Sequence, residues 1–354
     1  MISTNGRVAS CFLAVALVLA SCGGSAGDVV DSTTTTAAVA TTSPTTTSSV
    51  VPTTASPPPS TTLVGLEPVQ IPRLDDGLPA TFVAVTDDWE AVEVNTATGE
   101  RIRSIAQFDQ PSETGEEPGF FNAIQNIWRS PDGAWYAIST CCEPAAGAIY
   151  FIPQDGTLDA QSTENAVLVD GWTAAPSPFD DRFATLGFSI AIGAAGEDAD
   201  IVHSPDPADG MPNGSVAWHN NGHQVSWLSS DRGRPNLVTL DLDNPESGPD
   251  VVPLDWVDDT QWLQGIAMQQ SGRFVAFLNS QSDDPEAPEL IRTEGVAFDE
   301  FGLIATFDVE LGSFWGGYEP SGRMLIYTDG DNVVRWQGLG KSGVLGEGYL
   351  HASW

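Results

Sequence analysis

Basic side chains are scarce in this chain, and so are the residues that most often form reactive centres. Its 354 residues include 13 Lys and Arg, 4 His and 4 Cys, against 48 Asp and Glu, so the formal net charge is −35. This much negative charge repels phosphate backbones and anionic lipid headgroups, which disfavours nucleic-acid binding and electrostatic docking on a membrane. The charge favours an acidic secreted protein kept soluble by self-repulsion. The alternative is a site for calcium or another cationic ligand.

Long apolar runs are equally scarce. The run from Phe12 to Ala20 is too short to cross about 30 Å of hydrocarbon as a helix, but it has the length of a signal-peptide core. It ends in Leu19-Ala20-Ser21-Cys22, which resembles the bacterial lipobox, where the cysteine thiol receives diacylglycerol before cleavage. The resemblance implies a lipoprotein signal peptide over residues 1–21 and a mature chain anchored through Cys22 to the cell membrane, facing outside the cytoplasm. The alternative is an ordinary signal peptide with an incidental cysteine.

Residues 22–64 are mostly Thr, Ser, Pro and Ala. A segment of this composition buries too little apolar area to offset its conformational entropy, so it stays disordered. Its prolines extend it locally as polyproline II. Following an anchor, this segment is predicted to be a stalk that holds the remaining residues, 65–354, away from the membrane.

From Thr81 onward, helical periodicity is almost absent and short alternating runs recur, each typical of a β-strand. Most of these runs follow a tight-turn signature, whose turn positions are residues 133, 181, 222, 272 and 322. The separations between them are 48, 41, 50 and 50 residues. A period in the forties that is filled by four short strands is typical of a β-propeller blade.

One copy of the repeat is especially clear, namely Trp128-Arg129-Ser130-Pro131-Asp132-Gly133 followed by Trp135-Tyr136-Ala137-Ile138. It resembles the TolB-type propeller repeat, and the resemblance implies an all-β domain over residues 65–354. The end of the chain, from Leu350 to Trp354, is similar to a first blade strand that stops before its turn. Strands expected at Thr81–Asp88, Glu90–Asn95 and Arg101–Ile105 lack such a first strand. We therefore expect six four-stranded blades, one of them a composite of strands from both termini.

Propellers usually bind partners through loops between blades and between the second and third strands of a blade. Aromatic residues stand where the chain returns to the centre of the ring, and they form a candidate binding face: Phe121, Trp172, Trp262, Trp315 and Tyr349. Such a face suits sugars or peptides. The alternative is packing between blades, which a propeller needs whatever it binds.

Cys141 and Cys142 are adjacent, and no other cysteine remains in the domain once Cys22 is lipidated. Outside the cell, thiols are expected to oxidise. The options are a vicinal disulfide, pairing between molecules, or two free thiols, and we favour a vicinal disulfide that shapes its loop.

Metal sites are weakly supported. His219 and His223 have the spacing of a helical zinc pair, but they flank a turn between strands, so we expect exposed turn residues. The segments Asp241–Asn244 and Asp329–Asn332 carry carboxylates that calcium favours, yet neither has the register of a calcium loop, and both fall where hairpin turns belong. We predict no catalytic residue, no metal site and no cofactor, with structural calcium as the alternative.

These features favour a surface-tethered monomeric propeller that binds an envelope protein or a cell-wall glycan without catalysis. The alternative function is an extracellular hydrolase for polysaccharide or peptide. That function requires two carboxylates close together at the mouth of the central channel.

Overall fold

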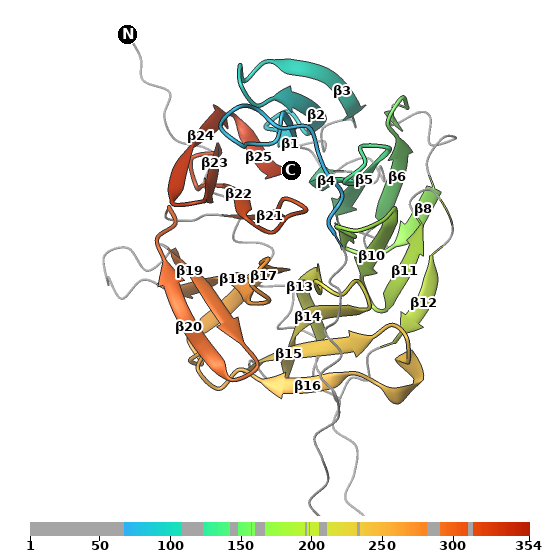
Figure 1. Ribbon diagram of the computed structural model, residues 1–354, viewed down its shortest axis with the longest axis vertical. Helices are drawn as coiled ribbons and strands as arrows, with labels where there is room; N and C mark the ends of the chain where they lie inside the picture. Colours follow the sequence, from blue (N-terminus) through green and yellow to red (C-terminus); the bar gives the residue numbers. More distant parts are fainter. Residues whose placement is uncertain are drawn as a thin grey trace, which may run out of the picture. The chain divides into compact units, whose positions relative to one another are not determined.

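The computed structural model describes residues 67–107, 123–141, 148–156, 158–159, 167–194, 197, 199–204, 211–231, 234–281, 291–310 and 314–354. This part of the chain is an all-β propeller of six blades arranged in a ring (Figure 1). A short 3-10 helix, η3 (Pro245–Ser247), precedes one outer strand. Within the described ranges, none of the helices is both long and apolar enough to cross a membrane.

Each blade runs from an inner strand at the ring axis to an outer strand at the rim, with antiparallel neighbours. Blade 2 contains β4 (Ala123–Arg129), β5 (Trp135–Cys141), β6 (Ala148–Pro153) and β8 (Val167–Asp170). Blade 3 contains β9 (Thr173–Pro176), β10 (Arg182–Leu186), β11 (Ile190–Ala194) and β12 (Asp200–His203). Blade 4 contains β13 (Met211–Trp218), β14 (Gln224–Asp231), β15 (Arg234–Asp241) and β16 (Asp250–Pro253). Blade 5 contains β17 (Gln261–Met268), β18 (Phe274–Gln281), β19 (Ile291–Asp299) and β20 (Gly302–Phe307). Blade 6 contains β21 (Phe314–Tyr318), β22 (Met324–Thr328), β23 (Val333–Gly338) and β24 (Lys341–Glu347).

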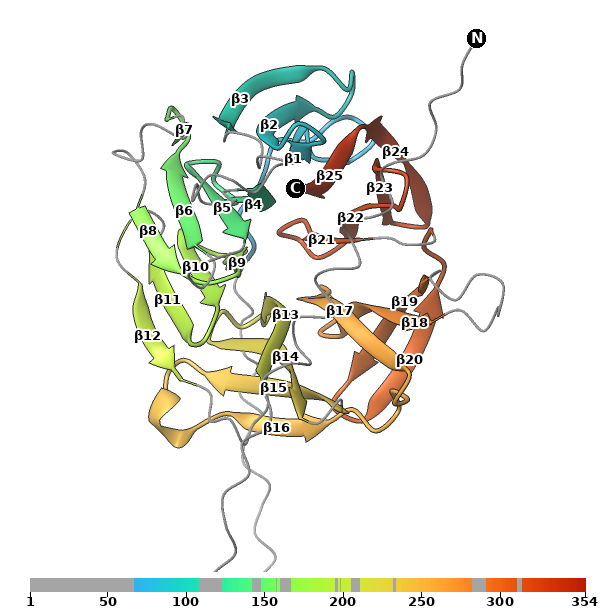
Figure 2. The ribbon, with the colours of Figure 1, turned by 180° about the vertical axis from the view of Figure 1, so that it is seen from behind.

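Blade 1 is the predicted composite, built from both ends of the domain (Figure 2). Its inner strand is β25 (Tyr349–Ser353), followed by β1 (Thr81–Thr86), β2 (Glu90–Asn95) and β3 (Arg101–Gln107). Ala84 pairs with Ala352 across the closure, while the two-residue strand β7 (Leu158–Asp159) adds to the outer edge in parallel with β3. Both the six-bladed ring and its closure by the two termini are confirmed.

The predicted turns connect inner to second strands in blades 2 to 6. Gly133, Gly222, Gly272 and Gly322 all have φ between +65° and +79°, a left-handed conformation that side chains with a Cβ disfavour. In blade 2, Asp132 Oδ1 accepts hydrogen bonds from the Ser130 hydroxyl (2.6 Å) and the Ala134 amide (2.9 Å). The Ser-Pro-Asp-Gly sequence therefore stabilises the turn through its own side chains.

The core lies between neighbouring blades, because both faces of each inner sheet are covered. In β1, every residue after Thr81 is buried, and four consecutive residues, Phe82 to Val85, are apolar. Aromatic rings fill the wedges between blades: Phe151 meets Phe183 at 4.8 Å between ring centroids, and Phe277 meets Tyr327 at 5.6 Å. These edge-to-face contacts hold adjacent blades together and position the inner strands around the axis.

Candidate functional site

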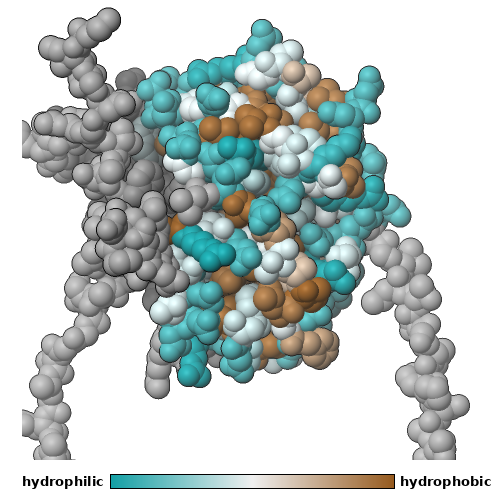
Figure 3. Space-filling view, turned by 90° about the vertical axis from the view of Figure 1, so that its left-hand side faces the viewer, coloured by the Kyte–Doolittle hydropathy of each residue, from teal (hydrophilic) through white to brown (hydrophobic). Residues whose placement is uncertain are grey.

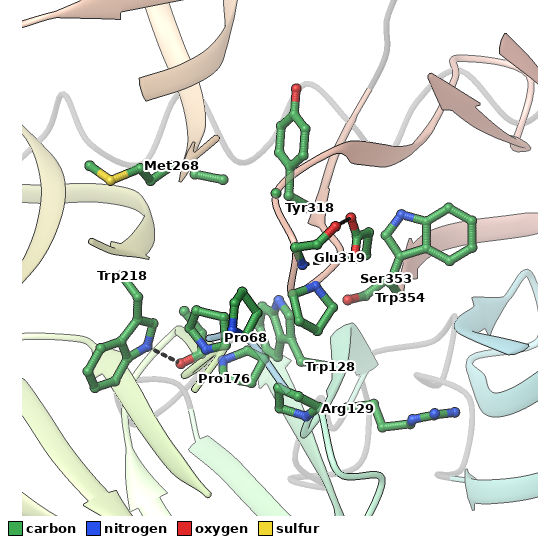
Figure 4. A pocket seen from close by; sticks show the side chains of 18 of the residues that line it. Pro68, Trp128, Arg129, Pro176, Trp218, Met268, Tyr318, Glu319, Ser353 and Trp354 are labelled. Atoms are coloured by element: carbon green, nitrogen blue, oxygen red, sulfur yellow. Dashed lines mark hydrogen bonds between the residues drawn. The ribbon is translucent and has the colours of Figure 1, made fainter. Parts of the chain in front are cut away.

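A cavity of about 350 Å³ lies where the inner strands end. Its wall contains residues from all six blades together with the segment that precedes β1 (Figure 4). Among the blade residues are Trp128, Arg129, Pro176, Trp218, Met268, Tyr318, Glu319 and Trp354. This volume lies within the range of ligand pockets in proteins, and the mixture of aromatic, aliphatic and few polar groups is typical of them.

Of the five aromatic residues predicted to form a binding face, the four within the described part of the chain lie at the other end of the inner strands. Trp172 directly precedes β9, Trp262 and Trp315 are the second residues of β17 and β21, and Tyr349 begins β25. The cavity instead borders the last residues of these strands and the turns that follow them. Because a strand rises about 3.3 Å per residue, the length of the inner strands separates the face with the predicted aromatic residues from the face with the cavity.

The structure distinguishes the predicted aromatic residues from one another. The ring of Trp172 packs edge-to-face on Phe188, which is 66% exposed, and Trp262 is 38% exposed. Tyr349 packs instead against the buried ring of Phe82, at 6.1 Å between centroids. That contact favours the packing interpretation for Tyr349.

Other predicted positions fall outside what the structure describes. Cys22, Phe121 and Cys142 lie outside the described residues. For Cys141 and Trp315 only the backbone is described, within β5 and β21. Their predicted roles in lipidation, disulfide formation and binding therefore stay predictions.

Residues 67–80 form a strap that borders the cavity on its way to β1, drawn in blue in Figure 1. The amide of Val69 donates a 2.8 Å hydrogen bond to the carbonyl of Pro178, in the turn of blade 3. Further along, Arg73 forms an ion pair with Glu319 of blade 6, with 2.7 Å between nitrogen and oxygen. Pro68, just before the first attachment, and Ile71, between the two, line the cavity.

The second half of the strap is a hairpin over residues 73–79. The amide of Leu74 donates to the carbonyl of Leu78 at 2.8 Å, and Arg73 and Pro79 form an antiparallel bridge. Leu78 is buried in the same hydrophobic cluster as Trp354, with Leu74 packed against it. The hairpin therefore contributes to the core that joins blades 1 and 6.

Glu319 is the most buried acidic residue of the cavity wall, with 1% of its surface exposed. Its carboxylate accepts hydrogen bonds from the amides of Ser321 (2.8 Å) and Arg323 (3.1 Å), from the Ser321 hydroxyl and from Arg73. Burial of a charge is tolerated when such donors surround it. Glu319 therefore acts as an anchor for the turn and the strap.

Arg129, the basic residue of the blade 2 wall, is also engaged. Its Nη1 donates to Thr81 Oγ1 at 2.5 Å and to Glu93 Oε1 at 3.0 Å, which ties blade 2 to blade 1. The Tyr136 hydroxyl donates to the other oxygen of Glu93 at 3.2 Å. Burial, followed by the negative charge of Glu93, raises the pKa of Tyr136, so its hydroxyl stays protonated as a donor.

Hydrogen bonds between consecutive turns join the blades around the cavity. Three of them are Arg182 Nη2 to Gly222 O (3.0 Å), Asn220 Nδ2 to Gln269 O (3.1 Å) and Arg323 Nε to Gln270 Oε1 (2.7 Å). They connect blades 3 to 4, 4 to 5 and 5 to 6. These side chains therefore stabilise the cavity wall and fix the distance between neighbouring blades.

The histidines at the blade 4 turn have separate environments. His223 is exposed and its ring lies 3.1 Å from Asp243 Oδ1, as expected of a turn residue. His219 is half-buried instead, which differs from the expectation that both are exposed. Its Nε2 lies 2.8 Å from the hydroxyl of Ser226, and its ring packs edge-to-face on Phe274. This burial lowers the pKa of His219 to about 4.

The two acidic segments considered for calcium are hairpin turns in the structure. Asp329 Oδ1 accepts hydrogen bonds from the amides of Asp331 (2.9 Å) and Val333 (3.0 Å), while Oδ2 meets Arg335 at 2.5 Å. Asp241 Oδ1 likewise accepts the amide of Asp243 at 3.0 Å. In the part of the chain that the structure describes, three or more His, Cys, Asp or Glu side chains do not gather into a metal-binding group.

The outer rim of blades 5 and 6 carries exposed apolar residues, including Phe301 (88% exposed), Leu303, Leu339 and Val344. On the side of the molecule shown in Figure 3, hydrophobic and hydrophilic residues alternate over the surface. Single apolar residues of this kind are common on soluble proteins. The rim therefore offers a weaker site than the cavity.

Two of the site's main residues escaped prediction from the sequence. Glu319-Pro320-Ser321-Gly322 has the same turn register as Ser130-Pro131-Asp132-Gly133, with a glutamate where blade 2 has serine. That substitution is the one local signal for Glu319. Arg73 lies before the first strand and has no comparable signal, because its partner is 246 residues away.

A scan against protein-family models and a search of curated proteins find no match to this chain. Among solved structures, a chain of a nidogen/laminin complex matches with a TM-score of 0.46 and 10% identity, over 77% of this chain and 97% of that one. A protein assigned as TolB from Agrobacterium tumefaciens matches with a TM-score of 0.35 and 15% identity, over 81% and 84%. Prolyl oligopeptidase B from Galerina marginata matches with a TM-score of 0.42 and 11% identity, over 75% and 50%. At these identities, the likeness concerns the propeller fold alone.

Proposed function

We propose that this protein is a lipid-anchored surface lipoprotein whose propeller binds an envelope protein or a cell-wall glycan at the cavity, without catalysis. The observation that supports it is the composition of the cavity wall. Aromatic and aliphatic side chains such as Trp218, Met268 and Tyr318 line the cavity. Arg129 and Glu319 are already engaged within the protein. Such a wall offers apolar contact area with few groups free to transfer protons.

A hydrolase would need a different arrangement of charged groups. Two carboxylates would have to converge on a bound substrate, one as acid and one as base or nucleophile. Among the described residues of the cavity wall, the carboxylates belong to Glu67 and Glu319. Glu319 accepts hydrogen bonds from donors of the turn, so its carboxylate is directed at the turn and not at the cavity. This favours binding over hydrolysis at the cavity.

The anchor in this proposal is Cys22, joined to the propeller by the stalk over residues 22–64. A Thr/Ser/Pro-rich chain of this length lets the domain explore a distance on the order of 40 Å from the membrane, by the square-root scaling of a flexible linker. Binding would then occur in the envelope, away from the lipid surface. The expected location is the outer side of the cell membrane.

Site-specific cross-linking in cells tests the binding site. A photoreactive phenylalanine replaces Tyr318 in the cavity wall, and a matched variant carries it at Phe301 on the outer rim. We expect a discrete adduct from position 318 that is absent from position 301. An adduct that resists muramidase indicates a protein partner, and one that muramidase removes indicates glycan. Identical patterns at both positions would contradict the proposed site.

Two further measurements test the anchor and the lack of catalysis. Cys22→Ser should move the protein from the membrane fraction to the soluble fraction and abolish its labelling by radioactive palmitate. Continued membrane retention would contradict lipidation. Purified protein incubated with cell-wall glycan and with unfolded protein should release no fragments, and release of either would favour the hydrolase.

A further inference from the structure

The strap consists of two parts that are attached with very different strength. The hairpin over residues 73–79 is held by the Arg73–Glu319 ion pair and by Leu78 in the hydrophobic core. Among the described residues, the preceding leader, residues 67–72, has one main-chain hydrogen bond to the blades, from Val69 to Pro178, and one to the end of the strap, from the Ala80 amide to the carbonyl of its last residue, Pro72. Its side chains are exposed or half-buried throughout.

The leader nevertheless forms part of the cavity wall. Glu67, Pro68, Ile71 and Pro72 belong to this wall, and Figure 4 draws Pro68 among the side chains that line the cavity, together with Pro176 and Trp128. The leader is extended, with prolines at its second and sixth positions. It is therefore an example, supplied by the chain itself, of a peptide seated at this site.

We propose that the cavity is a docking groove for an extended, proline-containing peptide segment of a partner protein, and that residues 67–72, which form one side of it, are an exchangeable internal ligand. This inference rests on the proposed function and specifies the partner as a protein segment. The incoming segment takes over the contacts of the leader. Its prolines pack against Trp128 and Pro176, and its main chain donates to the carbonyl of Pro178.

The chemistry of the groove suits such a peptide. Proline loses little conformational entropy on binding because its φ is already restricted, and aromatic side chains form flat walls for its ring. Trp128, Trp218, Tyr318 and Trp354 supply such surfaces around the cavity. The Pro178 carbonyl supplies a main-chain acceptor that fixes the peptide direction.

The hairpin keeps the leader close to the groove when the leader detaches. A segment joined by a short connection competes at an effective concentration of roughly millimolar. The intact protein should therefore bind free peptide weakly, and weakening the leader should raise the apparent affinity. Detachment breaks the Val69 hydrogen bond and leaves the Arg73–Glu319 pair in place.

The test uses the purified protein and a fluorescent peptide with the leader's own sequence, Glu-Pro-Val-Gln-Ile-Pro. In Val69→Pro the donor to Pro178 is lost, in a segment that has no regular secondary structure. The matched control is Gln70→Ala, which changes an exposed leader residue outside the cavity wall. By fluorescence anisotropy, we expect Val69→Pro to bind the peptide at least tenfold more tightly than the wild type, with Gln70→Ala unchanged. A peptide with both prolines replaced by alanine should bind at least tenfold more weakly.

The proposal would be overturned if Val69→Pro and the wild type bound the proline peptide with equal affinity. It would also be overturned if the alanine peptide bound as tightly as the proline peptide. A second variant, Ile71→Ser, weakens the leader without altering its backbone and should reproduce the gain. Hydrogen exchange on the wild type gives a measurement without substitution. The Val69 amide should exchange at least a hundredfold faster than the Leu74 amide, whose hydrogen bond lies within the hairpin, and equal protection would also overturn the proposal.

The peptide-binding test and the test of the proposed function can fail independently of each other. The peptide assay needs no natural partner, whereas the cross-link from position 318 needs no leader variant. If the peptide fails to bind while the cross-link forms, the cavity binds a partner of another chemistry. If the peptide binds while no cross-link forms, the groove recognises peptides and the proposed envelope partner is wrong.

Discussion

The guanidinium of Arg73 lies 2.7 Å from the carboxylate of Glu319, joining two residues 246 positions apart in the sequence. Arg73 precedes the first strand of the propeller, and Glu319 begins the turn between β21 and β22 of blade 6. The ion pair thus fastens the start of the domain to the blade next to its closure. The ring is closed by the pairing of β1 and β25, and the ion pair adds a second contact across this closure, on the side of the cavity.

Loss of this ion pair should destabilise the domain. Arg73→Ala leaves the buried carboxylate of Glu319 with fewer donors, and breaking a buried pair in this way is costly. The Arg73 side chain is partly exposed, so solvent reduces the effect. We expect a loss of about 2 kcal/mol in the free energy of unfolding, measured by urea denaturation.

A double-mutant cycle separates the pair from other contacts. Glu319→Gln removes the charge but keeps an acceptor for the amides of the turn. Adding Arg73→Ala to Glu319→Gln should cost at least about 1 kcal/mol less than adding it to the wild type, because the charge is no longer present to be left unpaired. Strict additivity would show that the two side chains do not interact energetically.

His219 should make stability depend on pH. Its folded pKa of about 4 lies below its ordinary value of 6.5, so protons bind preferentially to the unfolded chain. The stabilisation is present above pH 6.5 and is lost as the pH falls from 6.5 towards 4. We expect a loss of about 2 kcal/mol between pH 7 and pH 5. Urea unfolding at both pH values checks it, since His219→Gln should lack this share of the pH dependence.

Gly316 should not tolerate a side chain. A Cβ at this position would lie 2.3 Å from the carbonyl oxygen of Ala352 and 2.6 Å from that of Ile326, both backbone atoms of neighbouring strands. Gly316→Ala should therefore push β21 away from β22 and β25 and cost more than about 3 kcal/mol. Gly248→Ala is the control for backbone strain alone, since it has open space but a φ of 76° and a ψ of 167°, a conformation almost restricted to glycine, which costs about 2 kcal/mol. Thermal unfolding of the two variants should rank them in this order.

Trp354 fastens the C-terminus to blade 6. Its indole Nε1 donates to the carbonyl of Met324 at 3.0 Å, and its ring is buried in the cluster that contains Leu78. Trp354→Ala should cost about 3 kcal/mol through lost burial and lost hydrogen bonding, and Trp354→Phe distinctly less. Urea denaturation measures both. Equal stability of the alanine variant and the wild type would show that β25 holds the closure without its last residue.

The adjacent Cys141 and Cys142 are predicted to form a vicinal disulfide. Purified protein carrying Cys22→Ser should show no reactive thiol from this pair in denaturant before reduction, and two after it. Intact mass should rise by about 2 Da on reduction. A disulfide-linked dimer on a non-reducing gel would instead indicate pairing between molecules.

The blades could be predicted because their signals are local. The turn after Trp128 carries serine, proline, aspartate and glycine in an order that stabilises a turn by itself, and Gly222, Gly272 and Gly322 repeat its geometry. The alternating strands lie a fixed distance from each turn. The missing first strand at the N-terminus and the unpaired strand before Trp354 then required a composite blade, and the register of β1 with β25 confirms it.

The cavity and its strap could not be predicted, because they depend on contacts between distant residues. An aromatic residue such as Tyr349 has the same sequence signature whether it packs against Phe82 or faces a ligand. His219 follows a strand like an exposed turn residue, and only the approach of Phe274 and Ser226 buries it. No local pattern links Arg73 to Glu319.

The sequence by itself determined the all-β class, the number of blades and the closure by both termini, because turn chemistry and strand alternation act over a few residues. The tertiary structure decided which end of the inner strands is hollow and which segment lies across it. That outcome depends on how six blades pack around an axis and on where a carboxylate such as Glu319 becomes buried enough to require a distant partner.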